Sequence, residues 1–245
     1  MIMHTDLDGL KKLAHLFLYF EPEPTDVGLF IKHPFTDSPF VPFKTNDGYG
    51  VANILEDKDA FKNWKSQMRE IINDVETPSQ IAMLLTKSYK FAFLKYAMEY
   101  MSQGDFSEYL ADAWISCEMP NRDPNFTKFQ LLGLFKKANP QKLMSEKDYE
   151  FFKSLDDEIT VYRGVTPYNS DEVKVLSWTL DKEKAEWFAH RFDQEGTVYE
   201  ARISKSNIYA YFSDRNESEI IVNPKGLMNV HDINEDIGEG FSMLM

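Results

Sequence analysis

The stretch ITVYRGV, residues 159–165, opens the part of the chain that decides the fold. Four more short runs rich in β-branched and aromatic residues follow it, separated by turn residues. They are VKVLSWTL (173–180), GTVYEARI (196–203), NIYAYF (207–212) and EIIVN (219–223). Runs of this composition predict β-strands. An amphipathic helix is predicted among them over 181–192. Its inner face is predicted to carry Ala185, Phe188, Ala189 and Phe192.

The chain before residue 155 is predicted to be mainly helical. Apolar spacing and capping residues predict a first helix that is capped by Asp6 or Asp8 and runs to about residue 20. Further helices are predicted over 57–74, 78–103, 106–117, 127–138 and 145–152. The apolar stripe of the helix over 57–74 is formed by Phe61, Trp64, Met68 and Ile71. The segment 21–50 is predicted to be extended, because its prolines prevent a long helix. The sequence therefore predicts an α+β protein, with a mainly helical region over 1–155 and a β-rich domain over 156–245.

Composition limits the function. The chain has 245 residues, of which 43% are apolar, and a net charge of −13. This acidic balance argues against a general duplex-DNA binder and against adhesion to an anionic membrane. The single cysteine, Cys117, excludes an internal disulfide. Without a signal peptide or an apolar run of membrane-spanning length, we expect a soluble, cytoplasmic protein.

Two motifs of the β-rich domain suggest a polar site. Arg163 ends the run ITVYRG, where its planar fork could pair with phosphate or carboxylate, and Gly164 after it would let a flat ligand approach the backbone. In Ser177-Trp178-Thr179, strand alternation places both hydroxyls on one face, where they can orient a carboxylate. Each motif also has an ordinary explanation when it is taken singly. Arg163 could be a surface arginine at a strand end, and Ser177-Trp178-Thr179 could be an ordinary half-buried strand.

A third motif, Glu217-Ser218-Glu219, leads into the last run. On a strand, the two carboxylates would share a face at about 6–7 Å, which is unfavourable unless a cation or a chemical role compensates. A solvated edge strand is the alternative. The same pattern at Glu21 and Glu23, in a proline-rich setting, shows that it is common by itself.

The order of these three motifs resembles the arginine–serine–glutamate class of mono-ADP-ribosyltransferases, in particular its bacterial and phage members. The matching pieces are VYRG (161–164), SWTLDKEKAEWFAHRF (177–192) and RNESEIIVNPKGL (215–227). They cover less than a third of the chain. The family's second motif is often Ser-Thr-Ser, and here it is Ser-Trp-Thr. The resemblance implies that residues 156–245 form the catalytic core, as two packed, mainly antiparallel sheets with few helices.

The resemblance also implies a reaction and a set of roles. The enzyme would move ADP-ribose from NAD⁺, as substrate, to a macromolecule and release nicotinamide, without a metal. Glu219 would bind the ribose 2′-hydroxyl and stabilise the cationic ribose, and Ser177 would orient Glu219. Arg163 would bind the phosphates, Gly164 would hold the nicotinamide amide through its backbone, and Thr179 would support the strand.

The acceptor side follows from the same resemblance. Glu217 would orient or deprotonate the acceptor. The segment 209–216 would form the acceptor-recognition loop, with Tyr211, Phe212 and Arg215 as candidate contacts. Packing at a turn is the alternative for these three residues. Trp187, Phe188 and Phe192 could stack on nicotinamide, although helical spacing favours the core for most of them. The acceptor would be a protein side chain such as arginine, or RNA or DNA.

Two other functions fit the same residues. One is an NAD⁺ glycohydrolase, in which water is the acceptor. The other is a catalytically inactive module that binds NAD⁺ or a partner. Residues 1–155 could recruit the substrate, cover the site or dock an antitoxin or chaperone, as in a toxin-type effector.

Overall fold

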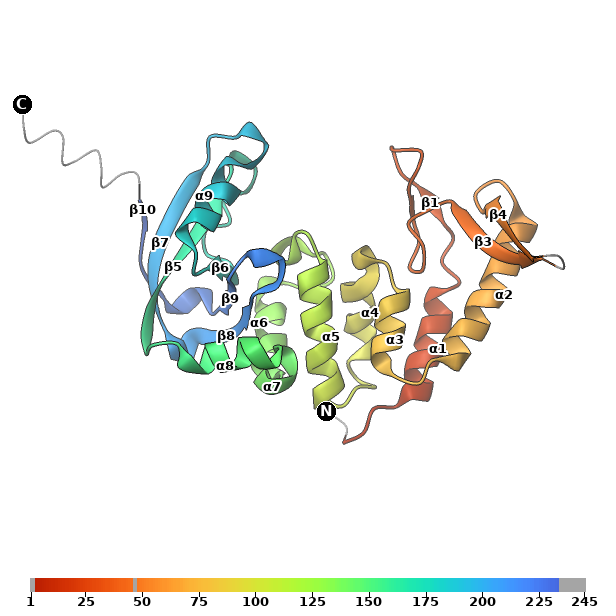
Figure 1. Cartoon of the computed structure of the whole chain (residues 1–245), viewed down its shortest axis with the longest axis horizontal. Coiled ribbons are helices and arrows are strands. Elements are labelled where there is room, and N and C mark those ends of the chain that lie inside the picture. The colour runs from red at the N-terminus through yellow and green to blue at the C-terminus, as the bar shows by residue number, and fades with distance from the viewer. Residues whose placement is uncertain (1–2, 46–47, 234–245) are drawn as a thin grey trace, which may run out of the picture. The chain divides into compact units, whose positions relative to one another are not determined.

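The structure is a computed structural model, and it describes residues 3–45 and 48–233. It confirms a mixed α+β fold, with helices and antiparallel sheets (Figure 1). The chain forms two compact units, residues 1–120 and 121–245. In the described part of the chain, no helix is both long and apolar enough to cross a membrane.

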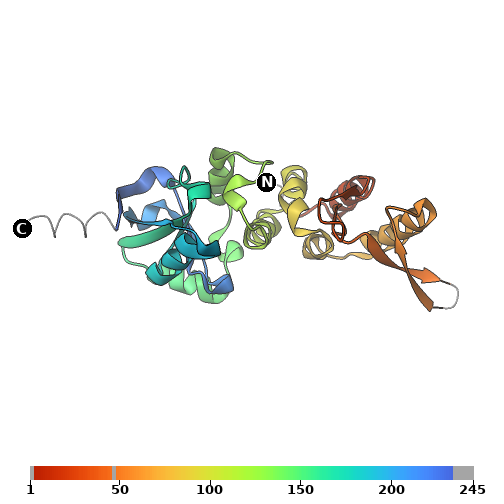
Figure 2. The same cartoon turned by 90° about the horizontal axis from the view of Figure 1, so that it is seen from above.

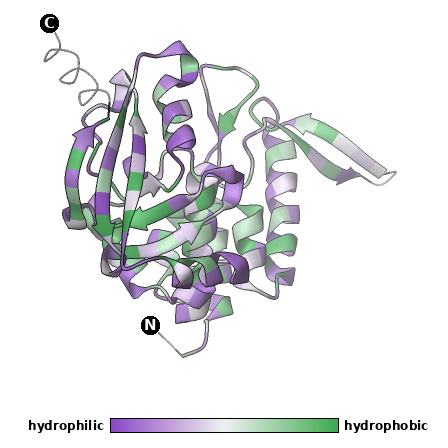
Figure 3. Ribbon diagram, turned by 60° about the vertical axis from the view of Figure 1, so that its left-hand side comes forward, coloured by the Kyte–Doolittle hydropathy of each residue, from purple (hydrophilic) through white to green (hydrophobic). Residues whose placement is uncertain are grey.

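The first unit is built mainly from helices. They are α1 (Leu7–Phe17), α2 (Lys58–Asp74), α3 (Pro78–Leu84), α4 (Lys90–Ala97) and α5 (Gln103–Ser116). The proline-rich segment is extended and forms two antiparallel pairs. These pair β1 (Glu23–Pro24) with β2 (Ile31–Lys32), and β3 (Phe40–Thr45) with β4 (Gly48–Asn53). The β3–β4 hairpin projects beyond the helix α2 beside it (Figures 2 and 3).

The predicted single helix over 78–103 is wrong, because α3 ends near Leu84 and a new helix begins at Lys90. Thr86 leaves the helical path to bind the extended segment. Its amide donates to the Pro34 carbonyl at 2.8 Å, and its hydroxyl donates to the His33 carbonyl at 3.1 Å. A tertiary contact therefore replaces the helical hydrogen bonds here, which local spacing cannot reveal.

The buried stripe of α2 differs from its prediction at one position. Trp64 and Met68 are buried as expected, but Ile72 is fully buried whereas Ile71 is 46% exposed. Steps of four residues keep the side chains on one face, which selects Ile72 over its neighbour.

A histidine is enclosed in the aromatic core of this unit. The His33 ring lies 5.1 Å from that of Trp64 and 6.1 Å from that of Phe61, centroid to centroid. Its Nδ1 accepts a hydrogen bond from the Phe35 amide at 3.1 Å. Burial lowers the pKa of His33 from 6.5 to about 4, a shift that nearby backbone carbonyls only partly oppose.

We expect the protein to lose stability as the pH falls from 6.5 to about 4. In this window the unfolded chain binds a proton at His33 that the folded chain does not, and the difference amounts to about 3 kcal/mol at its full extent. Urea unfolding across the window measures it. The control is His33→Asn, which keeps an acceptor for the Phe35 amide but does not titrate. Equal pH dependence in both proteins would contradict the assignment to His33.

The second unit holds a six-stranded sheet and the remaining helices. The strands are β5 (Glu158–Val165), β6 (Ser177–Thr179), β7 (Thr197–Ser204), β8 (Ile208–Phe212), β9 (Glu219–Val222) and β10 (Leu227–Asp232). The helices are α6 (Lys128–Lys137), α7 (Pro140–Leu143), α8 (Glu146–Ser154) and α9 (Lys182–His190). The compact unit thus begins at Asn121, so α6, α7 and most of α8 lie with the sheet rather than with the region over 1–155.

The sheet has the order β10-β7-β5-β6-β9-β8, and neighbouring strands are antiparallel. One residue pair, Tyr162 with Thr179, joins β5 to β6. The family resemblance implies two packed sheets. The described strands of this unit instead form one sheet, whose two three-stranded halves meet at this pair. Less and more buried residues alternate over 158–161 of β5 and over 201–204 of β7, as expected for strands with one covered face.

Helix α9 packs on β5 through small residues. Ala185 and Ala189 are fully buried, as predicted, whereas Phe188 is only half-buried. The prediction is wrong for Phe192, which is 79% exposed. The helix ends at His190, and Phe192 then takes a left-handed backbone conformation (φ 60°), so the helical spacing does not extend to it.

Candidate functional site

The structure brings together one residue from each of the three sequence motifs. Arg163 comes from β5, Ser177 begins β6 and Glu219 begins β9. The Ser177 hydroxyl donates to Glu219 Oε1 at 2.5 Å, and Arg163 Nη1 donates to the Ser177 carbonyl at 2.7 Å. Residues distant in sequence therefore form one hydrogen-bonded chain where the two halves of the sheet meet.

Strand register explains the contact between the serine and the glutamate. In the β6–β9 pair, Ser177 is opposite Ile221, and Thr179 is opposite Glu219. Glu219 is two residues from Ile221, so its side chain lies on the same face as Ser177, as a diagonal neighbour. Diagonal neighbours of an antiparallel pair are within reach of long side chains.

Glu219 is a carboxylate largely withdrawn from water, with 7% of its surface exposed. A buried carboxylate is costly unless hydrogen bonds or opposite charge compensate it. The Ser177 hydroxyl supplies a hydrogen bond, and the Arg163 guanidinium lies close enough for mutual electrostatic attraction. Such a held carboxylate can stabilise a positive charge placed beside it.

Arg163 braces the backbone of the site. Its Nε donates to the Glu172 carbonyl at 2.9 Å, in addition to the bond from Nη1 to Ser177. Burial lowers the pKa of Arg163 to about 10, although Glu172 and Glu219 oppose the shift. From the sequence, this guanidinium is expected to point at a ligand. The structure commits at least two of its donors to main-chain carbonyls.

A second set of charged residues was missed by sequence reasoning. Glu172 is buried, and its carboxylate lies 2.9 Å from Arg122 Nε and 3.4 Å from Lys128 Nζ. Asn121 accepts a hydrogen bond from the Leu176 amide at 3.2 Å, next to Ser177. These contacts fix the segment between β5 and β6. No local motif marks them, because the partners are about fifty residues apart in sequence.

The interpretation of Glu217 and Glu219 as neighbours on one strand is wrong. Strand β9 begins at Glu219, and Arg215, Asn216 and Ser218 have left-handed backbone conformations (φ 57°, 55° and 45°). Such conformations are unfavourable for residues other than glycine, and they form a turn instead of a strand. Glu217 lies in this turn, 3.3 Å from Arg215 Nε.

Thr179 holds that turn against the sheet. Its hydroxyl donates to the Glu217 carbonyl at 2.7 Å and accepts from the Asp181 amide at 3.0 Å. Asp181 in turn caps α9 by accepting from the Lys184 amide. These two hydrogen bonds of Thr179 link the segment before β9 to the start of α9, which agrees with the supporting role predicted for this residue.

Two of the three candidate acceptor contacts are internal. Tyr211 and Phe212 belong to β8 and are buried, so the predicted loop over 209–216 is wrong for its first half. The Tyr211 ring lies 4.3 Å from that of Phe151, centroid to centroid, and its amide contacts Met144 Sδ. Both residues therefore pack in the core of the second unit. Arg215, by contrast, is partly exposed in the turn.

Gly164 serves helix packing. A Cβ at this position would lie 2.0 Å from the Ala185 carbonyl oxygen and 2.6 Å from the Ala189 nitrogen. The space beside the Gly164 α-carbon is therefore occupied by the backbone of α9. A close approach is the reason for the glycine, as expected, but the group that approaches is helix α9 and not a ligand.

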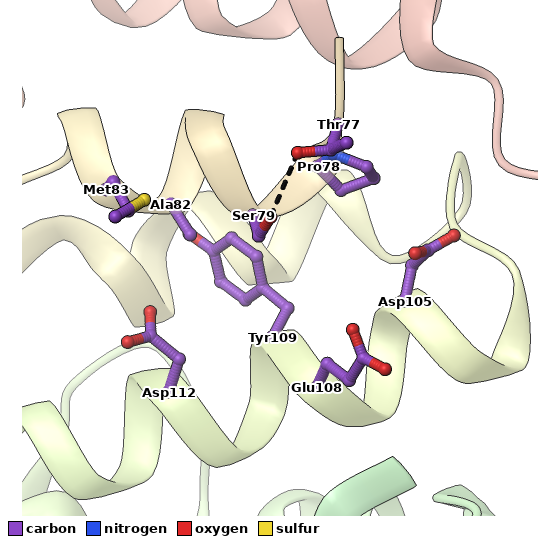
Figure 4. Close-up of a pocket in the computed structure, with 9 residues that line it drawn as sticks. All are labelled: Thr77, Pro78, Ser79, Ala82, Met83, Asp105, Glu108, Tyr109 and Asp112. Carbon is purple, nitrogen blue, oxygen red and sulfur yellow. Dashed lines mark hydrogen bonds between the residues drawn. The ribbon is translucent and has the colours of Figure 1, made fainter. Parts of the chain in front are cut away.

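The first unit contains a pocket of about 350 Å³ between α3 and α5 (Figure 4). The Tyr109 ring reaches from α5 toward α3, and acidic side chains follow α5. Asp105 already accepts hydrogen bonds from Thr5 and Ser102, and Asp112 pairs with Lys90 at 2.6 Å. Asp105 and Asp112 therefore already have structural partners within the unit. For this reason we place the candidate site at the cluster around Glu219 and not in this pocket.

No group of histidine, cysteine, aspartate and glutamate side chains within the described residues is arranged to hold a metal ion. No protein family model, curated protein or solved structure matches the chain.

Proposed function

We propose that the chain is a mono-ADP-ribosyltransferase that moves ADP-ribose from NAD⁺ to a macromolecular acceptor. The observation that carries the proposal is the hydrogen bond from Ser177 to the buried carboxylate of Glu219, with Arg163 bonded to the same serine. These residues stand at the three matching positions of the family resemblance. We also propose that the six-stranded sheet, with halves joined by a single pair, is a variant of that family's catalytic core.

The reaction needs a carboxylate of this kind. The bond between the ribose anomeric carbon and the nicotinamide nitrogen breaks, and its electron pair leaves with nicotinamide, which becomes neutral. The ribose then carries an oxocarbenium-like positive charge. A preorganised carboxylate stabilises that charge without solvent reorganisation, as in glycosidases. Glu219, fixed by Ser177 on a strand, fits this role.

The acceptor forms a new bond to the anomeric carbon and loses a proton. Glu217 is the candidate to orient the acceptor or to take this proton, because it lies in the turn that leads into Glu219. Its ion pair with Arg215 holds the side chain at the edge of the site. Arg215 is partly exposed and is our remaining candidate for contact with the acceptor.

Label transfer from adenylate-labelled NAD⁺ tests the function. The full chain is incubated with bacterial lysate. One part of the products is then digested with protease and another part with nuclease. Label lost to protease identifies a protein acceptor, and label lost to nuclease identifies a nucleic acid. Release of nicotinamide without labelled macromolecule would assign an NAD⁺ glycohydrolase instead. Failure to release nicotinamide at all would overturn the enzyme and leave a binding module.

We expect Ser177→Ala to lower the turnover number for nicotinamide release by about 10- to 100-fold. The substitution removes the hydroxyl that orients Glu219, and a lost hydrogen bond to a charged group costs about 1.5–3 kcal/mol. Ser170→Ala is the matched control, because Ser170 is exposed and donates only to the Pro167 carbonyl. Steady-state kinetics of both variants measure the effect. Unchanged turnover in Ser177→Ala would remove Ser177 from the mechanism.

A further inference from the structure

The β1–β2 hairpin of the first unit exposes apolar side chains at its tip. Val27, Leu29 and Phe30 are each more than half exposed. Figure 1 shows the hairpin that starts with β1 extending beyond the end of α1. Because apolar side chains that gather at a surface mark sites of interaction, this tip is a candidate contact for a partner.

Hydrogen bonds close the tip. The Thr25 hydroxyl lies 2.8 Å from the Val27 carbonyl oxygen and 2.9 Å from that of Phe30. The Phe30 amide donates to the Val27 carbonyl at 2.9 Å. At the base of the hairpin, Ile31 is buried and its amide donates to the Asp37 carbonyl at 2.9 Å. The exposed apolar side chains therefore stand on a preorganised turn, which lowers the entropic cost of binding.

The same hairpin is acidic. Glu21, Glu23 and Asp26 are exposed, and Lys32, opposite Glu23 in the β1–β2 pair, is the only basic residue over 21–32. Among the residues that the structure describes, no cation lies within ion-pair distance of these three carboxylates. We define the hairpin patch as Glu21, Glu23, Asp26, Val27, Leu29 and Phe30. A partner that covers it has to supply both positive charge and apolar surface.

Charge argues against the other occupants of an exposed apolar tip. Nucleic acids and anionic lipid headgroups are repelled by the carboxylates of the hairpin patch. A second copy of the chain has a net charge of −13. In a symmetric dimer it would also place an identical acidic patch against the first. The partner is therefore a protein with a basic surface.

Prolines limit how such a partner can bind. Pro22 lies just before β1 and Pro24 ends it, and neither has an amide N–H to pair with an added strand. Contact is therefore made through side chains. A helix suits this contact, because its backbone is hydrogen-bonded internally and its surface can carry apolar and basic side chains side by side.

We propose that the hairpin patch is the docking site for a cationic amphipathic helix of a protein partner. The apolar face of that helix covers the tip, and its lysines or arginines pair with the three carboxylates. The complex thus uses the groups that the chain by itself leaves in water. The inference rests on the first unit alone and is independent of the chemistry proposed for Glu219.

The β3–β4 hairpin provides a matched control. It also exposes apolar side chains, among them Tyr49 and Val51. Over 40–53, however, it has one lysine and one aspartate, so its charges cancel. A partner selected by charge and apolar surface together distinguishes the two hairpins.

Fluorescence anisotropy of a labelled synthetic peptide tests the inference on the full chain. The probe is a peptide of about 18 lysine and leucine residues with its leucines on one helical face, long enough to form a helix. Leu29→Ser combined with Phe30→Ser is expected to weaken its binding at least tenfold, because the peptide would then bury less apolar surface. The control, Tyr49→Ser combined with Val51→Ser, is expected to stay within twofold of the unchanged protein.

A second pair of variants tests charge. Glutamine in place of both glutamates of the hairpin patch, and asparagine in place of its aspartate, is expected to weaken binding about tenfold and to reduce its salt dependence. The control removes the same net charge from exposed residues at the end of α2, through Glu70→Gln, Asp74→Asn and Glu76→Gln. It is expected to stay within threefold of the unchanged protein. Equal weakening by both sets would show attraction to net charge alone and would overturn the inference.

Three further outcomes would also overturn it. The first is equal peptide binding by the Leu29→Ser, Phe30→Ser variant and the unchanged protein, or no binding by either. The second is self-association of the unchanged chain in sedimentation velocity that this variant abolishes, since the occupant would then be a second copy. The third is binding to phosphatidylserine vesicles that this variant loses, which would assign the patch to a membrane. Urea unfolding verifies that each variant is folded.

Discussion

Glu219→Gln is expected to reduce nicotinamide release by about 10³-fold. The amide keeps an oxygen that accepts from the Ser177 hydroxyl, but it carries no charge to stabilise the cationic ribose. Loss of one preorganised electrostatic group in an active site costs about 10²–10³-fold in turnover. The measurement is the single-turnover rate of nicotinamide release at saturating NAD⁺, with urea unfolding to show that the variant is folded.

Glu158→Gln is the matched control. Glu158 begins β5 in the same unit, and its partly exposed carboxylate pairs with Arg202 on the neighbouring strand. We expect its turnover to stay within twofold of the unchanged protein, because an exposed pair contributes little. If Glu219→Gln were as active as this control, Glu219 would not be the catalytic carboxylate.

Gly164→Ala is expected to destabilise the second unit by about 3 kcal/mol, the upper part of the usual range for overpacking. The added Cβ would lie 2.0 Å from the Ala185 carbonyl oxygen and 2.6 Å from the Ala189 nitrogen. Both are backbone atoms of α9, so the whole helix must shift. Amide hydrogen exchange of β5 and α9 measures the change within this unit, where protection should fall about 10²-fold.

Gly133→Ala is expected to stabilise the second unit, whereas Gly164→Ala destabilises it. Gly133 lies inside α6, and no atom lies within 4 Å of the position that its Cβ would take. Alanine in a helix interior is favoured over glycine by up to about 1 kcal/mol. Exchange protection in α6 should therefore rise. Equal protection of β5 in Gly164→Ala and the unchanged protein would show that α9 is free to move away, and the close packing would then be unimportant.

The sequence was most informative where local rules decide the structure. The helices predicted from residues 57, 127 and 145 begin there. The side chain of Asp57, Thr127 or Ser145 accepts a hydrogen bond from an amide of the first turn. Each β-rich run after residue 158 contains a strand, although 173–180 is a strand only over Ser177–Thr179. The hydroxyl of Ser177 and the carboxylate of Glu219 also meet. Strand alternation is a local property that spacing can express.

Other features depend on partners distant in the chain. Thr86 binds the carbonyls of residues 33 and 34, which breaks a helix that local spacing extends to residue 103. Tyr211 and Phe212 lie in the segment that the resemblance implies to be a recognition loop, yet they are buried in β8, as the composition of NIYAYF predicts. The left-handed conformations of Arg215, Asn216 and Ser218 form a turn, so Glu217 is not part of the strand. The sequence Glu-Ser-Glu contains no glycine or proline that would predict this turn.

For this protein, then, the sequence by itself determined the α+β class, the strands and the three motif residues Arg163, Ser177 and Glu219. Only the tertiary structure decided that α9 fills the space beside Gly164, and that Arg163 donates to the main-chain carbonyls of Glu172 and Ser177. The physical reason is that propensity, capping and alternation act over a few residues. Close packing and charge act between atoms that the chain brings together only when it folds.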